Sequence, residues 1–472
     1  MPSAAFFVIL RPETIKVKIL KEMSSQAKSP TELGTANIGR LLISYALPAI
    51  AAQMAASIYN VVDSIFIGRG VEPMALAGLG ITLPLMNMAA AFGALVGAGG
   101  AALLSIKLGQ KDHRAASLVL GNVVILNVVI GLSVMLFGLV FMDKILYLFG
   151  ASDESLPYAR DFMQVILIGN VITHMYFGLS CLVRSCGFPK KAMAITMMSV
   201  GVNVLLAPLF IFVFHWGIAG AAWATVISQL SALMVLLVHF ADKKKYIHFE
   251  REIFHLDWGI IKGIISVGMS PFMMNICACL VVIIINNQLY THGGDYAIGA
   301  YGIVNKVLML FAMLVLGLNQ GMQPIAGYNY GAQQFDRVKE VLKKTIVYAT
   351  AVMCVAFAVC ELFPQLICAI FTDDDEMTRI SSSAMRIMIA TFPIVGFQMV
   401  TSNFFQSIGR AGIAVILSTT RQMLFLIPSL LLLPGFFGLN GVWLSMPVSD
   451  TLSTIVTAIF LVREYKKIGK TA

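Results

Sequence analysis

The stretch Leu41–Gly68, LLISYALPAIAAQMAASIYNVVDSIFIG, decides the fold. It is long and apolar enough to cross a bilayer, since about 20 such residues suffice. Two of its residues are unfavourable in hydrocarbon: Pro48 removes a backbone donor, and Asp63 places a carboxylate near the far end. A charge at the bilayer centre costs at least about 2.5 kcal/mol, so such residues usually face a bundle interior or a water-filled cavity. Asp63 is therefore either a functional carboxylate or a solvated residue at the helix end.

The rest of the chain has the composition of a helical membrane protein. Its 472 residues are 58% hydrophobic and only 12% charged, whereas a soluble domain is about 25% charged. Further apolar segments lie at 81–106, 117–141, 162–182, 192–214, 217–240, 259–289, 300–326, 345–371, 384–406, 413–433 and 438–462. With the first stretch, they predict about twelve transmembrane helices.

The two halves of the chain repeat each other. YALPAI near residue 48 aligns with GMSPFM near 271, VRSCG at 183–187 with FQSIG at 405–409, and WGIAGAAW at 216–223 with FGLNGVW at 437–443. The offset is about 222 residues, which indicates a duplicated six-helix unit. Because six is even, the copies have the same orientation, with an axis along the membrane normal and a cavity between them. Such a frame favours alternating access.

We therefore expect an all-α polytopic membrane protein with two six-helix lobes related by a parallel internal repeat. The N-lobe is 41–240 and the C-lobe 259–462, with an N-terminal tail at 1–40, a linker at 241–258 and a C-terminal tail at 463–472. Lysine and arginine gather in alternate loops, at 107–114, 184–191 and 243–251 among others, and in the tails. The positive-inside rule then places both termini and the linker in the cytoplasm, with the protein in the inner (plasma) membrane.

The charge pattern excludes several other classes. The net charge of +9 follows the topology of the loops and predicts no nucleic-acid partner. The acidic run Thr372–Glu376 is most simply a solvated outward loop. Seven cysteines lie mostly inside apolar segments without zinc spacing, and no catalytic constellation is apparent. We expect no enzyme activity, no metal site, no cofactor and a monomer.

Polar residues inside the spans are the candidates for function. Asp450 and Arg421 lie at similar depth on neighbouring predicted helices and can pair, either to fasten the C-lobe or as a site where substrate or proton competes for Asp450. Lys306 either reaches outward or faces the cavity as a cation. Asn203 can bond to Asp63 or make an ordinary interhelical contact. Uncharged candidates for the cavity are Gln53, Asn286 and Gln320.

Several motifs taken in order resemble the multidrug and toxic compound extrusion (MATE) transporters, particularly their MepA-like bacterial branch. They are YNVVDSIFIG at 59–68, CLVRSCGFPKKA at 181–192, GIAGAAWATVISQ at 217–229 and GMQPIAGYNYGA at 321–332. The resemblance covers about residues 38–465. It implies export of cationic amphiphilic drugs and dyes in exchange for H⁺ or Na⁺. It also implies that Asp63 takes up and releases the coupling cation, assisted by Asn203.

One position departs from the pattern of the family. An aspartate commonly follows the asparagine by four residues, on the same helix face, but here that position is Ala207. Either Asp63 works alone, or coupling has moved to the C-lobe around Asp450 and Lys306, or transport is impaired. The choice between proton and sodium stays open. The alternative function is a flippase for lipid-linked precursors, which would be expected to have more buried cations than Lys306 and Arg421.

Overall fold

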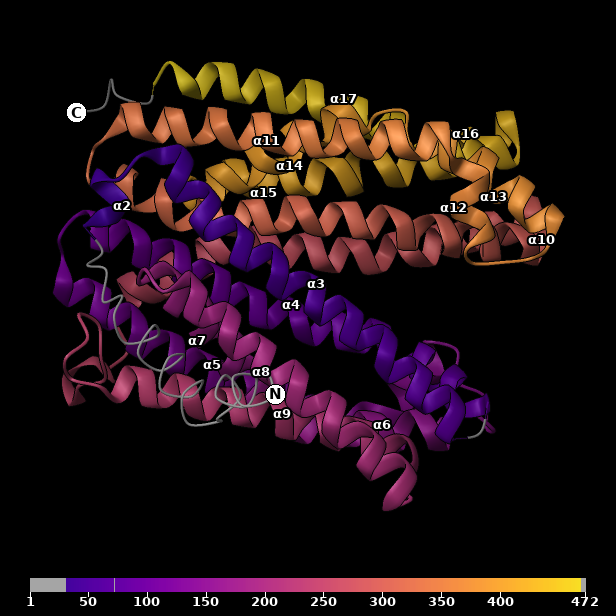
Figure 1. Ribbon diagram of the computed structural model, residues 1–472, viewed down its shortest axis with the longest axis horizontal. Helices are drawn as coiled ribbons and strands as arrows, with labels where there is room; N and C mark the ends of the chain where they lie inside the picture. The colour runs from indigo at the N-terminus through magenta and orange to yellow at the C-terminus, as the bar shows by residue number, and fades with distance from the viewer. Residues whose placement is uncertain (1–30, 72, 468–472) are drawn as a thin grey trace, which may run out of the picture.

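The apolar runs become long helices that lie nearly parallel in two bundles, one from each half of the chain (Figure 1). The structure, a computed structural model, describes residues 31–71 and 73–467, so most of the predicted N-terminal tail lies outside the described residues. The N-lobe contains α3 (Ile38–Gly70), α4 (Pro73–Gly109), α5 (His113–Leu148), α6 (Leu156–Ile168), α7 (Asn170–Ser185), α8 (Pro189–Pro208), the π-helix η1 (Leu209–Val213) and α9 (Gly217–Ala241), and is preceded by α2 (Glu32–Thr35). The predicted linker carries one short helix, η2 (Arg251–Ile253).

The C-lobe begins with one very long element. Its helices are α10 (Trp258–Gly331), α11 (Phe335–Leu362), α12 (Pro364–Ala369), α13 (Asp375–Ile389), α14 (Phe392–Ser407), α15 (Ala411–Thr419), the π-helix η3 (Thr420–Leu426), α16 (Ile427–Phe437) and α17 (Leu439–Tyr465). Within α10, Gly294 has φ 63° and ψ −159°, a conformation essentially restricted to glycine, and it divides the element into two helices.

The predicted number of spans agrees with this architecture. Nine helices in the described ranges are long and apolar enough to cross a membrane, or eleven if each of two bent helix pairs counts as one span. One of those nine is α10, which contains two predicted spans on either side of Gly294. Counted in this way, the twelve spans expected from the sequence are present.

Two spans are bent, which the sequence did not predict. The axes of α6 and α7 differ by 54°, as do those of α13 and α14. The second break has a simple cause, because Pro393 lies in the first turn of α14 and cannot continue a preceding helix. At the first break, Gly169 packs so closely on Val226 that a Cβ there would lie 2.4 Å from its Cγ2 atom.

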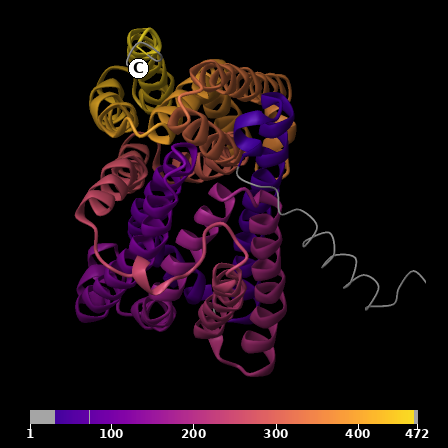
Figure 2. The ribbon, with the colours of Figure 1, turned by 90° about the vertical axis from the view of Figure 1, so that its left-hand side faces the viewer.

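The ends of the bundles differ in charge. At one end lie the start of α3, the loops 107–114, 184–191, 241–257 and 331–337, and the end of α17; we call it the basic end (left in Figure 1). The opposite end carries the turns near 71, 150, 294 and 373. Viewed from the basic end, the C-lobe lies above the N-lobe (Figure 2), and α3 and α4 lie against α10 (Figure 1).

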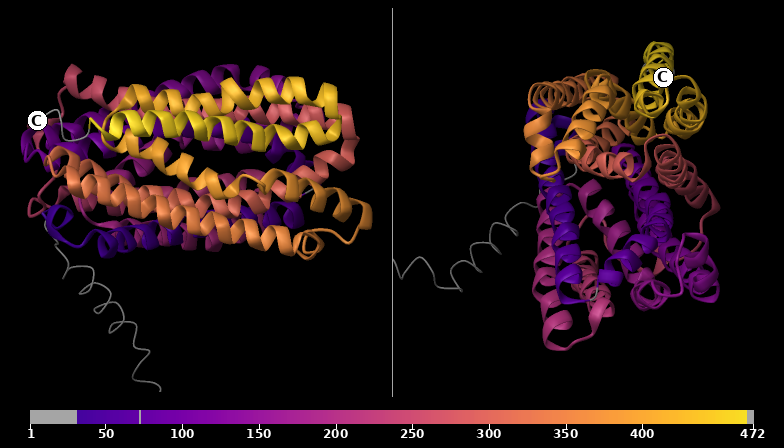
Figure 3. Two further views of the ribbon diagram at one scale, coloured as in Figure 1. Left: turned by 90° about the horizontal axis from the view of Figure 1, so that it is seen from above. Right: turned by 90° about the vertical axis from the view of Figure 1, so that its right-hand side faces the viewer.

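Glycines allow the two lobes to approach closely toward the basic end. A Cβ at Gly268 would lie 1.7 Å from the Leu95 carbonyl oxygen, and one at Gly331 would lie 2.1 Å from that of Ile106. Similar backbone approaches occur at Gly99, Gly317 and Gly321. All five positions lie in the basic-end halves of their helices, and the ribbons spread apart toward the opposite end (Figures 1 and 3).

Candidate functional site

The N-lobe candidate is a polar cluster in the interior of the helix bundle. Asp63 lies on the last part of α3 and is half-buried, and its Oδ1 atom is buried without a hydrogen-bond partner. Asn203 on α8, 1% exposed, interacts with the Asp63 carboxyl. The structure therefore brings together the two residues predicted to bind the coupling cation, and their role stays a prediction.

A second layer of this cluster comes from residues that sequence reasoning missed. The Asn203 amide donates to Thr225 Oγ1 on α9 at 3.2 Å, while its own Oδ1 is buried without a partner. Tyr59, one turn before Asp63 on α3, interacts with both Thr225 and Asp63. Two interacting residues, Asp63 and Asn203, thus each present a buried oxygen that lacks a donor. Since an unsatisfied buried oxygen is costly, a proton or a small cation here would be stabilised.

Ala207, the departure from the family pattern, faces an apolar surface. It is fully buried in a small cluster with Phe210 and Ala224, against which Phe66 packs. Phe66 follows Asp63 on α3 by three residues and Ala207 follows Asn203 on α8 by four. The space beyond the Asp63–Asn203 pair is thus filled by hydrocarbon, so Asp63 has no second carboxylate from this position.

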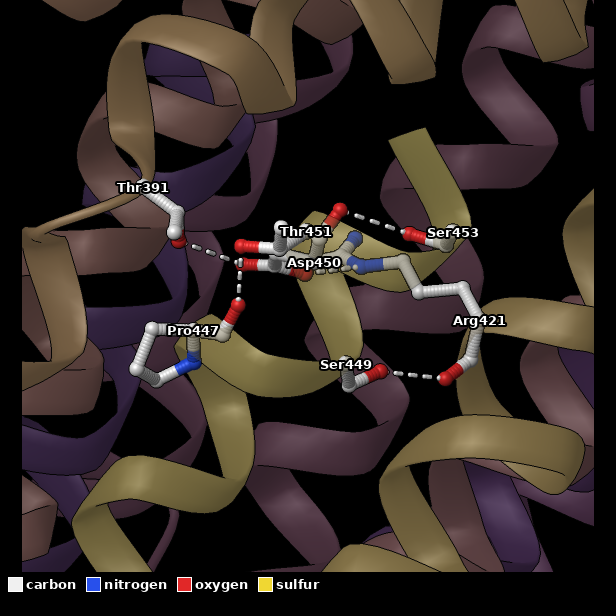
Figure 4. A network of polar contacts seen from close by, with 7 residues as sticks. All are labelled: Thr391, Arg421, Pro447, Ser449, Asp450, Thr451 and Ser453. Carbon is white, nitrogen blue, oxygen red and sulfur yellow. Dashed lines mark hydrogen bonds and ion pairs between the residues drawn. The ribbon is translucent and has the colours of Figure 1, made fainter. Parts of the chain in front are cut away.

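The C-lobe contains the ion pair expected from the sequence (Figure 4). Arg421 Nε donates to Asp450 Oδ1 at 2.7 Å, and Thr391 Oγ1 donates to Asp450 Oδ2 at 3.4 Å. The Asp450 side chain is 5% exposed and that of Arg421 is 30% exposed. Both carboxylate oxygens of Asp450 therefore have a donor, unlike Asp63.

A local irregularity of the helix supports the position of Arg421. Arg421 belongs to η3, a π-helical segment, in which the wider turn changes the positions of the backbone carbonyls relative to an α-helix. Ser449 Oγ on α17 donates to the Arg421 carbonyl oxygen at 2.7 Å (Figure 4). The backbone as well as the side chain of Arg421 is thus bound to the helix that carries Asp450.

The corresponding contact in the N-lobe is uncharged. Gln229 on α9 takes the position that Asp450 takes in the repeat, and its Oε1 accepts from Thr173 Oγ1 at 2.5 Å. Thr173 lies just after the bend at Gly169, much as Thr391 lies at the bend between α13 and α14. In both lobes a threonine at the bent span donates a hydrogen bond to the last helix, but the acceptor is a neutral glutamine in the N-lobe and an aspartate in the C-lobe.

The other predicted residues are more scattered. Gln53 and Asn286 are half-buried, and Lys306 is exposed and takes part in none of the ion pairs found within residues 31–71 and 73–467. Gln320 on α10 accepts a hydrogen bond from Arg184 on α7, which joins the two lobes. The described part of the chain has no group of three His, Cys, Asp or Glu that could hold a metal ion.

The fold and the buried carboxylates define a class: a membrane transporter built of two repeated helical lobes. The MatE family model matches residues 48–209 and 271–431, once in each lobe and together more than half of the chain. The chain belongs to the MatE family, whose members are transporters and not enzymes.

Curated relatives agree with this assignment. Multidrug export protein MepA of Staphylococcus haemolyticus (strain JCSC1435) is 26% identical over 426 residues, which cover 90% of this chain and 93% of the relative. The protein of the same name from Staphylococcus aureus (strain NCTC 8325 / PS 47) is 25% identical over 427 residues, covering 90% and 94%.

Two solved structures share the fold. A multidrug resistance MATE family transporter in an outward-facing conformation superposes with a TM-score of 0.88 at 22% identity, covering 93% of this chain and 98% of that one. A MOP superfamily transporter from Pyrococcus furiosus also gives a TM-score of 0.88 at 22% identity, covering 94% and 99%.

Proposed function

We propose that this chain is a secondary active multidrug exporter that expels cationic amphiphilic compounds in exchange for H⁺ or Na⁺ by alternating access. The observation that carries the proposal is the Asp63–Asn203 cluster, where two buried oxygens lack a donor inside the N-lobe. A proton or cation that enters from one side satisfies them, and its departure on the other side restores the empty site. Coupling to substrate then follows from their different affinities for the two states.

The substrate class is supported by the relatives. The two MepA proteins are multidrug exporters by name and match about nine-tenths of the chain. A carboxylate without a cationic partner, such as Asp63, favours cationic over anionic ligands, and its place inside a membrane-spanning bundle favours lipophilic ones. We therefore propose small lipophilic cations as substrates.

The basic end indicates how the protein is oriented in the membrane and which side of it is closed. By the positive-inside rule we propose that this end faces the cytoplasm, with both termini on that side of the plasma (inner) membrane. Separately, we propose that the working unit is a monomer. The close approaches at Gly268 and Gly331 then lie on the cytoplasmic side. The structure accordingly represents an outward-facing state in this scheme.

The flippase alternative has less support. Of the two cations considered for a diphosphate site, Arg421 is paired with Asp450 at 2.7 Å and Lys306 is exposed. A site for a diphosphate needs several unpaired donors directed at one place. Binding of a lipid diphosphate and of a lipophilic cation to the purified protein compares the two functions directly.

The decisive experiment measures efflux of a fluorescent lipophilic cation from cells and inverted membrane vesicles, under separately imposed proton and sodium gradients. The test variant is Asp63→Asn, which keeps the size of the side chain but removes its charge. The matched control is Asp161→Asn, which removes an exposed carboxylate near the opposite end.

We expect the parent and Asp161→Asn to export the dye, and Asp63→Asn to lose gradient-driven export while retaining its folded yield. The gradient that drives export identifies the ion. Equal export by Asp63→Asn and the parent would refute the role of Asp63, and Asp450 would become the next residue to change.

A further inference from the structure

One unusual contact at the basic end joins the start of the N-lobe to the C-lobe. Arg337 on α11 donates through its terminal NH2 group to the carbonyl oxygens of Leu33 at 3.1 Å and Ala36 at 2.7 Å. Its Nε donates to Asn329 Oδ1 at 2.8 Å, and Asn329 Nδ2 donates to the Leu33 carbonyl at 2.9 Å. We call Arg337 and Asn329, with the carbonyls they hold, the arginine clamp.

The arginine clamp is closely packed, and Arg337 itself is half-buried. Asn329 is fully buried and Leu33 is 1% exposed. Gly34 lies so near the C-lobe that a Cβ there would be 2.9 Å from the ring of Tyr328. A charged fork that satisfies buried carbonyl oxygens in such a setting makes a strong and directional contact.

A second contact of the same kind runs in the other direction. Asn122 on α5 of the N-lobe donates through Nδ2 to the His255 carbonyl at 3.2 Å and accepts at Oδ1 from the Asp257 amide at 3.2 Å. Beside it, Gly121 approaches the linker so closely that a Cβ would lie 2.0 Å from the Ile253 carbonyl oxygen. We call Asn122 and Gly121, with this backbone, the asparagine clamp.

The two clamps occupy related places in the repeat. α5 and α11 are the third spans of their lobes, and each holds the chain just before the first span of the other lobe. In both cases the held segment leads directly into a helix cap: Asn37 Oδ1 accepts from the Gly39 amide at 3.0 Å, and Asp257 Oδ1 from the Ile260 amide at 3.0 Å. Since the helices begin at the clamps, α3 and α10 cannot tilt at this end without moving the held carbonyls.

We propose that the arginine clamp and the asparagine clamp together keep the basic end closed, and that the hydrogen bonds of both clamps break together when this end opens. Arg337, Asn329 and Asn122 are then positioning residues of the transport cycle, far from the candidate cation site at Asp63. The side chains of the clamps bond to backbone groups of residues 33–36 and 255–257, so replacing Arg337 or Asn122 removes these bonds directly. This inference rests on the proposed alternating access but not on any particular substrate or ion.

The test uses hydrogen–deuterium exchange of the full chain in lipid nanodiscs, read by mass spectrometry without substrate. The variant is Arg337→Ala, and the matched control is Lys343→Ala, which removes an exposed charge from the same helix. Losing hydrogen bonds from a charged group shifts an opening equilibrium by about tenfold or more. We expect Arg337→Ala to raise exchange about tenfold at residues 33–40 and also at 253–260, and to lower it near 150 and 294 at the opposite end.

A purely local role predicts a different pattern, with faster exchange at residues 33–40 alone, and that result would overturn the proposal. The reciprocal variant Asn122→Ala provides an independent check if Arg337→Ala yields too little folded protein. It should raise exchange at residues 33–40, although the bonds of Asn122 outside its own helix are to His255 and Asp257. Because no dye or ion gradient enters this experiment, its failure is distinguishable from a failure of the proposed export function.

Discussion

The ion pair between Arg421 and Asp450 gives the sharpest energetic prediction, because its two partners differ in burial. Replacing Arg421 with Met leaves a carboxylate that is 5% exposed without its cation, retaining only the 3.4 Å contact with Thr391. Replacing Asp450 with Asn leaves a guanidinium that is 30% exposed and within reach of water. The first change should therefore destabilise the protein more than the second.

The magnitudes follow from the behaviour of buried pairs. Removing one partner of a fully buried pair costs about 3–5 kcal/mol, whereas replacing both partners by apolar residues is often neutral. We expect a loss of about 3 kcal/mol for Arg421→Met, and about 1–2 kcal/mol for Asp450→Asn because the remaining cation is partly exposed. The double variant Arg421→Met/Asp450→Leu should be within about 1 kcal/mol of the parent.

The assay is the free energy of unfolding of the detergent-solubilised chain, measured by denaturant titration for the parent and the three variants. Dye efflux from cells that express each variant is measured in parallel. If the pair only fastens the C-lobe, the double variant should export as the parent does. If Asp450 takes part in coupling, the double variant is stable and inactive.

The critical result is which of the two single variants loses more free energy of unfolding. A larger loss for Asp450→Asn than for Arg421→Met would mean that Arg421, and not Asp450, carries the desolvation penalty. If the double variant Arg421→Met/Asp450→Leu were about 4–5 kcal/mol less stable than the parent, replacing both charged partners by apolar residues would not relieve the cost of breaking the pair, and the reasoning would be refuted.

Two further predictions concern glycines. Gly268→Ala places a Cβ only 1.7 Å from the Leu95 carbonyl oxygen, so the two lobes must move apart. We expect this variant to lose about 1–3 kcal/mol of stability in thermal unfolding. The control Gly302→Ala has open space around the added Cβ and should not lose stability. Gly294→Ala forces an alanine to adopt φ 63° and ψ −159° and should cost about 1–3 kcal/mol of stability in the same assay. The control Gly412→Ala, which has open space around the added Cβ, should leave the unfolding temperature unchanged. Equal effects of Gly294→Ala and Gly412→Ala would contradict this account.

Much of the fold could be predicted because the bilayer restricts the possible structures. Apolar runs of about 20 residues can only be helices in hydrocarbon, and the repeat fixed the relation between the lobes. The bend at Gly169 was not predicted, because it depends on the contact with Val226, which lies 57 residues away in the chain. The break between α13 and α14 had a visible signal in Pro393, but a proline in a span equally permits a mild kink.

From the sequence, residues of the candidate sites could be paired only where they are charged. Arg421 and Asp450 were paired from the sequence because opposite charges at equal depth in neighbouring spans have few other partners. Thr391 and Tyr59 gave no such signal, since threonine and tyrosine occur in many spans without a special role. Arg337 was indistinguishable from any cation of a basic loop, because two of its three acceptors are backbone carbonyls 301 and 304 residues away.

The asymmetry between the lobes bears on where coupling occurs. A cation or proton that binds Asp450 must first break an existing contact with Arg421 and then leave that guanidinium unpaired. One that binds Asp63 breaks no ion pair and satisfies a buried oxygen that already lacks a donor. A coupling site must bind and release its ion on every cycle, so the smaller change in free energy supports our proposal that the ion binds at Asp63 and not at Asp450. The absence of a carboxylate at Ala207 is compatible with this proposal, since binding at Asp63 would use its unpaired oxygen and would not need a second negative charge.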